Sequence, residues 1–301
     1  MTPRPVPATG AADGSDALDA GGGRVSDLEL DRRAYRSSRA RRSTLTAVAS
    51  TLTFAVVMAV GVTSTPGWDR VRSQFLDAEV ARAALPRVLQ GLWLNLRVLV
   101  VAAVLVVLLG LAVAVLRTLR GPVLAPLRLL ATAYTDLFRG LPLIIVLYVV
   151  GFGVPGLRLQ GVPTSAAVLG TVALVLVYSA YVAEVFRAGI ESVHPGQVAA
   201  ARSLGLTHRQ TTRLVVLPQA LRTVTPALLN DFVALQKDVG LISVLGAVDA
   251  VRAAQIQAAR AFDFTPYVVA GLLFVLLAVP TVRVADRVAR RAAGRERAGG
   301  A

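Results

Sequence analysis

Six apolar stretches of 18 to 26 residues run through this chain of 301 residues and constrain its fold more than any other feature. About 20 apolar residues in a helix cross a bilayer, so each stretch is long enough to span one. Backbone polar groups find no water inside lipid and must pair within their own segment, which favours helices. The sequence therefore predicts an all-α membrane protein with six transmembrane helices: Leu45–Thr63, Gly91–Leu116, Leu129–Val150, Thr164–Phe186, Thr223–Val248 and Thr265–Val282.

The distribution of arginine between the connections predicts the orientation of these helices. If residue 44 lies in the cytoplasm, the cytoplasmic connections hold 20 arginines and the external ones hold 7. Basic residues are enriched on the cytoplasmic side of membrane proteins, so both termini are expected to be cytoplasmic. This pattern also accounts for the net charge of +14. The excess of cations flanks apolar runs, so we expect a lipid bilayer and no nucleic acid as the partner of these residues.

Composition excludes several classes of site. The chain has no cysteine, two distant histidines (His194 and His208) and one lysine, Lys237, which Asp238 follows. A cysteine-based metal site and a disulfide are therefore excluded, and the two histidines do not indicate a metal cluster. A phosphate-binding P-loop needs lysine followed by serine or threonine, so this chain does not hydrolyse ATP by that device. We expect no catalytic residue, no metal and no cofactor bound by the chain itself.

The order of segments predicts five regions. Residues 1–44 form a cytoplasmic tail, disordered through residue 31 and then basic, and residues 45–63 form a first, uncleaved span. Residues 64–90 form an external loop in which short surface helices are expected, as they are around Ala250–Asp263. Residues 91–288 form the transmembrane domain, with a cytoplasmic loop at 188–222, and residues 289–301 form a basic cytoplasmic tail.

Polar residues at membrane depth mark four places of interest, because ionisable groups there are costly and usually face a bundle interior or a water-filled path. They are Arg139 beside Gly140 and Pro142, where a helix break is expected; Glu184 with Arg187; Asn230, Asp231, Gln236, Lys237 and Asp238; and Asn95 with Arg97. One interpretation is a lining for a solute path formed by Arg139, Glu184, Asn230, Lys237 and Asp238. The other is ion pairing that holds the helices together, and the sequence leaves both open.

The loop at 188–222 predicts two short helices that meet at a glycine. Gln197–Leu204 is rich in alanine and is followed by Gly205, a typical helix stop. Thr207 and Gln210 then fit a capping box that starts a second helix, which Pro218 is expected to limit. The pair is suited to docking in a groove of another protein, and the alternative is a solvated loop with helical character.

The residues of this loop resemble the cytoplasmic signature of ABC-importer permeases. The matching positions are Ala200-Ala201, Gly205, Val215 and Leu217-Pro218, with Gly196, Gln197 and Ala199 beside them. Four further stretches resemble the polar amino-acid subfamily (histidine, glutamine and glutamate type): Tyr134–Pro142, Ala180–Ile190, Leu217–Leu221 and Leu235–Gly246. The resemblance covers roughly residues 88–290.

The resemblance implies a permease subunit of an ATP-driven importer in the bacterial cytoplasmic membrane. Its implied partners are a cytoplasmic ATPase dimer, which binds ATP and Mg, a second permease (the same or a homologous chain), an external solute-binding protein and a polar amino acid. Helix 197–205 would be the coupling helix. Two departures stand out: Ala199 replaces the glutamate that usually precedes the two alanines, and the span 45–63 is additional to the family core of five.

Three other interpretations remain open at this point. An ion-coupled secondary transporter can also have six spans with buried charges and broken helices. A structural membrane protein would use the same charges as ion pairs only. A membrane-embedded enzyme is the least favoured, because both histidines lie in the cytoplasmic loop.

Overall fold

The computed structural model describes residues 27–118 and 121–299. Every regular element in these ranges is helical, so the predicted all-α class is confirmed. The chain forms two compact units, Met1–Trp68 and Asp69–Ala301. The predicted disorder of residues 1–26 and the last two residues of the predicted basic tail lie outside the described part.

The first unit contains one long helix, α1 (Asp27–Thr63). The helix begins at Asp27, well before Leu45, and so includes part of the predicted tail. The prediction that residues 27–31 are disordered was therefore wrong. Leucine, alanine and arginine are abundant in α1 and all favour helix. The helix of the apolar run therefore extends backward through the basic residues that precede it. The apolar part, Ser43–Thr63, is long enough to cross a membrane, and none of it is buried.

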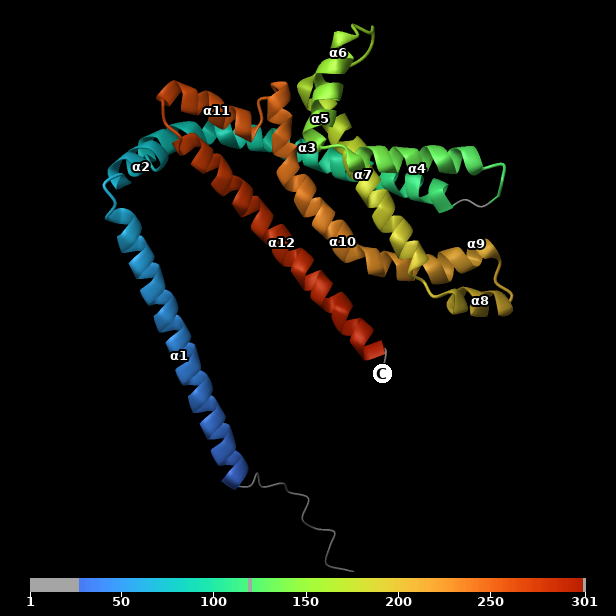
Figure 1. Ribbon diagram of the computed structural model, residues 1–301, viewed down its shortest axis with the longest axis horizontal. Helices are drawn as coiled ribbons and strands as arrows, with labels where there is room; N and C mark the ends of the chain where they lie inside the picture. Colours follow the sequence, from blue (N-terminus) through green and yellow to red (C-terminus); the bar gives the residue numbers. More distant parts are fainter. Residues whose placement is uncertain (1–26, 119–120, 300–301) are drawn as a thin grey trace, which may run out of the picture. The chain divides into compact units, whose positions relative to one another are not determined.

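The second unit contains all the remaining helices. They are α2 (Trp68–Phe75), α3 (Ala78–Thr118), α4 (Ala125–Gly140), α5 (Leu143–Tyr148), the π-helical turn η1 (Val149–Gly153), α6 (Val154–Gly156), α7 (Ala166–Glu191), α8 (Pro195–Ser203), α9 (His208–Thr211), the π-helical turn η2 (Thr212–Val216), α10 (Leu217–Asp238), the 3-10 helix η3 (Val239–Leu245), α11 (Ala250–Ala261) and α12 (Thr265–Gly299). Figure 1 shows α8 and α9 together at one end of this unit, next to the start of α10.

The core of this unit lies where α3, α7 and α10 pack together. Its buried side chains include Ala102, Val106, Leu174, Val182 and Leu235. Gly110 allows α3 to approach α7 closely, since a Cβ there would stand 2.7 Å from Cγ1 of Val182. Small residues at helix contacts are typical of membrane proteins, where close packing rather than exclusion of water holds helices together.

Within the described ranges, four helices are long and apolar enough to cross a membrane, or six spans are present if two bent pairs each count as one. The four are within Ser43–Thr63, Trp68–Thr118, Ala166–Glu191 and Thr265–Arg291. The expected span over residues 129–150 bends by 106° between α4 and α5, and the segment around residues 223–248 belongs to a second pair that bends by 53° before α11. The predicted break next to Arg139 is therefore present.

Helices α3 and α12 extend beyond the two predicted boundaries of the transmembrane domain. The external loop does hold the expected short helix, α2, but residues 78–90 belong to α3 rather than to the loop. Pro86 does not end the helix, because Ala84 and Val88 on either side of it are buried against α11 and α12. At the other end, α12 continues to Gly299 through most of the predicted basic tail.

Candidate functional site

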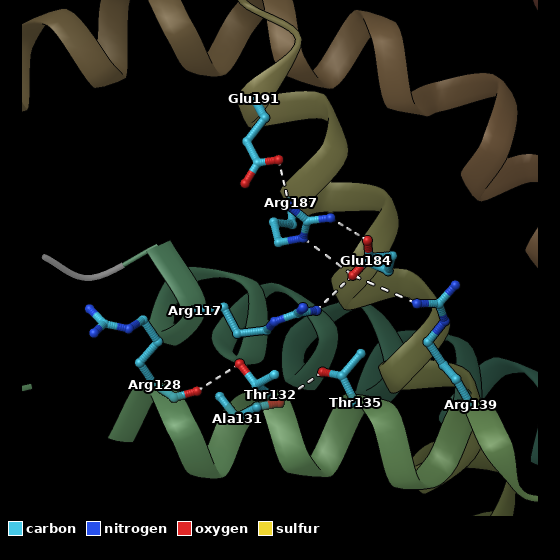
Figure 2. Close-up of polar contacts among 9 residues, drawn as sticks. All are labelled: Arg117, Arg128, Ala131, Thr132, Thr135, Arg139, Glu184, Arg187 and Glu191. Atoms are coloured by element: carbon cyan, nitrogen blue, oxygen red, sulfur yellow. Dashed lines mark hydrogen bonds and ion pairs between the residues drawn. The ribbon is translucent and has the colours of Figure 1, made fainter. Parts of the chain in front are cut away.

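Glu184, on the C-terminal half of α7, is the centre of a cluster of ion pairs (Figure 2). Its Oε2 lies 2.7 Å from Nη1 of Arg117 at the end of α3, and its Oε1 lies 2.5 Å from Nη2 of Arg187. Nη1 of Arg139, at the end of α4, lies 3.8 Å from the same Oε2. Arg187 also pairs with Glu191. One carboxylate therefore joins α3, α4 and α7. Of these ion pairs, sequence reasoning had named only the one between Glu184 and Arg187, which are three residues apart on α7.

The break between α4 and α5 follows directly after Arg139 and Gly140. Leu141 and Pro142 have extended backbone conformations, with ψ of 134° and 133°. The N–H of Leu141 still donates to the carbonyl of Leu137 at 3.1 Å, so α4 ends with its last turn closed. Since proline has no N–H to continue the ladder, Pro142 fixes the point where the chain changes direction.

A hollow of about 250 Å³ lies beside this break. It is lined by Leu141, Pro142 and Leu143 from the break, Val177, Tyr178 and Tyr181 from α7, and Asp231, Ala234 and Asp238 from α10. The hydroxyl of Tyr178 donates to Oδ2 of Asp238 at 2.7 Å. Oδ2 of Asp231 is buried and has no hydrogen-bond partner. The hollow thus presents two carboxylates and two phenol groups, one carboxylate being unpaired.

The predicted path residues lie at different distances from this hollow. Asp238 lines it. Arg139 lies next to its wall, with its guanidinium carbon 5.9 Å from the ring centroid of Tyr181, and Glu184 is one helical turn beyond Tyr181 on α7. Asn230 and Lys237 are exposed and do not line the hollow. Their roles stay predictions.

Sequence reasoning named Asn230, Lys237 and Asp238 on α10 as path residues, and one of these, Asp238, lies in the wall of the hollow. Asp231, noted among the polar residues of the same run, and Ala234 complete the α10 part of the wall. The signal was present: Asp231 and Asp238 are seven apart, and Tyr178 and Tyr181 are three apart, so each pair shares a helical face. Choosing between neighbouring faces needs the position of α7, which the sequence does not contain.

Asn95 on α3 contributes to helix packing and does not line the hollow. It is fully buried; its Nδ2 donates to the carbonyl of Val239 at 3.1 Å and to Oδ2 of Asp249 at 3.0 Å. Its Oδ1 accepts from the N–H of Ala250 at 3.0 Å. Arg97, the other residue of this predicted place, stacks on Trp93 at 5.4 Å. Asn95 therefore holds the junction between η3 and α11 against α3.

The two helices of the predicted coupling loop are present as α8 and α9. Gly205 has φ of +84°, and the N–H groups of Gly205 and Leu206 donate to the carbonyls of Arg202 and Ala201, which closes α8 with a Schellman motif. Thr207 and Gln210 form the predicted capping box. Ala199 and Ala200 are exposed, whereas Ala201 is buried.

Pro218 does not limit the second helix, contrary to the prediction. The chain stays helical from His208 to Leu245 because a π-helical turn, η2, precedes the proline and relieves the crowding around its ring. A side-chain contact joins this region to α8: Nε2 of Gln219 donates to Oε1 of Gln197 at 2.6 Å. Val198 of α8 also packs against Val216 and Ala220.

No group of three or more His, Cys, Asp or Glu residues within the described ranges is arranged to hold a metal ion.

Comparison with known proteins places this architecture in a family. Residues 123–294 match the family model described as the inner membrane component of binding-protein-dependent transport systems. The chain belongs to this family. The match includes every residue that lines the hollow and the whole loop 188–222. Members of this family are transport components, so the chain is a transport subunit and not an enzyme.

Similar relatives and a solved structure support the same assignment. The arginine transport system permease protein ArtQ of Bacillus subtilis is 32% identical over 72% of this chain and 97% of its own length. The probable glutamine ABC transporter permease protein GlnM of the same organism is 39% identical over 57% of this chain and 77% of its own length. A crystal structure of an amino acid ABC transporter with histidines superposes with a TM-score of 0.65 and 33% identity, covering 72% of this chain and 99% of that one.

Proposed function

We propose that this chain is the permease subunit of an ATP-driven importer that carries polar amino acids across the bacterial cytoplasmic membrane by alternating access. The observation that carries the proposal is the hollow between the α4–α5 break, α7 and α10, which presents two carboxylates and two phenols. Buried polar groups of this kind are expected where a polar solute replaces the missing hydrogen-bond partners. The relatives named for arginine and glutamine transport support amino acids as the solute class.

The partners follow from the exposed surfaces of the second unit. We place the cytoplasmic ATPase dimer on α8, whose exposed Ala199 and Ala200 form a small, rigid face beside Gly196 and Gln197. We place a second permease, the same or a homologous chain, on the exposed face of α10 that carries Asn230 and Lys237. The external binding protein would dock at the opposite end. In this arrangement the chain has six spans, counting each bent pair as one, and both termini are cytoplasmic.

In this mechanism ATP and Mg bind to the ATPase subunits, and their closure moves α8. The contact between Gln197 and Gln219 and the packing of Val198 on Val216 and Ala220 give α8 a direct mechanical connection to α10. Because Asp231 and Asp238 lie on α10, a displacement of this helix changes the wall of the hollow itself. The pairs of Glu184 with Arg117 and Arg187 keep the end of α3 against α7 during that change.

The proposal is tested by uptake of labelled polar amino acids in the native host, with and without this gene. We expect loss of uptake for at least one amino acid, restored by the wild-type gene and not by Asp238→Asn. Asp286→Asn, on an exposed position of α12, is the matched control and should restore uptake fully. Unchanged uptake across the panel would overturn the assignment to amino acids. Uptake that survives inactivation of the partner ATPase would favour an ion-coupled secondary transporter.

A further inference from the structure

The charged side chains that line the hollow complement only one of the two charges of a zwitterionic amino acid. Both ionisable carboxyl groups in the wall, Asp231 and Asp238, suit the ammonium group of a zwitterion. The lining contains no arginine or lysine for the carboxylate of that zwitterion. A buried carboxylate without a cation or several donors is strongly disfavoured, so a complementary cation must come from nearby.

Arg139 is positioned to supply that cation. It lies two residues before Leu141, which lines the hollow, and its guanidinium faces the ring of Tyr181, which forms part of the wall. The hydroxyl of Tyr181 donates to the carbonyl of Arg139 at 3.4 Å and holds this part of the backbone beside α7. One aromatic ring therefore lies between the guanidinium and the space where a solute would bind.

Arg139 is also the member of the Glu184 cluster that can leave it. Its distance to the carboxylate, 3.8 Å, is the longest of the three arginine contacts, and its side chain is 41% exposed. Arg117 and Arg187 are 12% and 28% exposed and make the shorter contacts. When Arg139 moves away, Glu184 keeps two guanidinium partners, so no uncompensated charge is left behind.

We propose that Arg139 exchanges Glu184 for the α-carboxylate of the amino acid bound in the hollow, while the unpaired carboxylate of Asp231 accepts the ammonium group. This assignment rests on the proposed function and narrows its ligand to compounds that carry both charges. The planar guanidinium donates two parallel hydrogen bonds to a carboxylate, a geometry that the ammonium of lysine does not reproduce.

The test is direct binding to the purified permease–ATPase complex without the external protein, measured by saturation-transfer NMR. Three amino acids are compared with the amines left when their α-carboxylate is removed: L-arginine with agmatine, L-glutamine with 4-aminobutanamide, and L-glutamate with 4-aminobutanoate. For the amino acid that binds, wild type should prefer it over its amine by about tenfold or more, as expected for a charge-assisted hydrogen-bonded pair.

Arg139→Gln should reduce this preference to about one by weakening amino-acid binding, and binding of the amine should not change. Arg139→Lys should give an intermediate preference, and Asp231→Asn should weaken amino acid and amine together. The matched control is Arg97→Gln, which removes another exposed arginine that stacks on an aromatic ring, away from the hollow. It should keep the wild-type preference.

Two outcomes overturn the inference: Arg139→Gln retains the preference, or it weakens amino acid and amine equally. Both are distinct from failure of the proposed function, in which wild type neither binds nor imports any amino acid of the panel. Retained binding of the amine by Arg139→Gln also shows that the variant is folded, so a loss of preference cannot be ascribed to misfolding.

Discussion

Asn95, which is buried, and Asp231, which is half-buried, differ in how their buried polar atoms are satisfied. Asn95 uses both ends of its amide in three hydrogen bonds within the chain. Asp231 leaves a buried oxygen without a partner. Buried polar atoms that are satisfied stabilise a fold, whereas one without a partner is costly and requires a reason. The contrast assigns Asn95 to packing and leaves Asp231 available to a ligand.

Gly91 is the residue at which the packing beside Asn95 can be tested. A Cβ at this position would lie 2.3 Å from the backbone carbon of Asp249, which cannot move aside as a flexible side chain would. Gly91→Ala should therefore destabilise the protein by about 1–3 kcal/mol through overpacking. We expect the unfolding temperature of the purified permease to fall by about 2–4 °C per kcal/mol.

The control for that substitution is Gly271→Ala on α12, where a Cβ would meet no atom within 4 Å. Alanine favours helix over glycine by about 1 kcal/mol, so the unfolding temperature should stay the same or rise. Equal shifts in the two variants would show that the approach of α3 to the η3–α11 junction is not tight in the protein.

At the scale of one element, α8 offers a test of how much the missing glutamate matters. Ala199 is exposed, so Ala199→Glu introduces a good helix former without burying a charge. An exposed ion pair contributes at most about 1 kcal/mol, and affinity for the ATPase subunit should therefore rise by about fivefold or less. Thermophoresis with the purified ATPase measures the change, and the unfolding temperature of the permease should not move.

Ala201→Glu is the contrasting variant on the same helix. Ala201 is buried, so its replacement places an unpaired carboxylate among apolar neighbours and should disrupt α8. ATPase binding should then be lost.

A weaker affinity of Ala199→Glu would show that the groove that receives α8 does not present a cation at this position.

The elements predicted correctly from the sequence are those determined by local chemistry. The helix stop at Gly205, the capping box at Thr207 and the break at Pro142 depend on residues within one turn of each other. The elements predicted wrongly depend on partners far away in the chain. The early start of α3 follows from the packing of Ala84 and Val88 on α11 and α12. On α10, the position of α7 decides that Asp238 lines the hollow and that Asn230 and Lys237 do not.

At the scale of the whole molecule, α1 belongs to a different compact unit from the helices of the transport domain. The family match begins at residue 123, and the apolar part of α1 has no buried residue. Six arginines precede its apolar run, at positions 32, 33, 36, 39, 41 and 42. Such a basic segment favours retention in the cytoplasm, so the span that follows would deliver the start of α3 to the external side.

Deletion of residues 2–66 should therefore lower the amount of correctly oriented permease without changing the transport domain itself. We expect the unfolding temperature to stay the same, because every side chain of residues 43–66 is exposed, and uptake per correctly oriented molecule to match wild type. Protease accessibility of a tag at the carboxyl terminus measures orientation. Replacing the six arginines by glutamine, with α1 retained, should lower the oriented fraction in the same way. If normalised uptake falls in the deletion variant but not in the glutamine variant, α1 belongs to the transport machinery, and its role is not confined to topology.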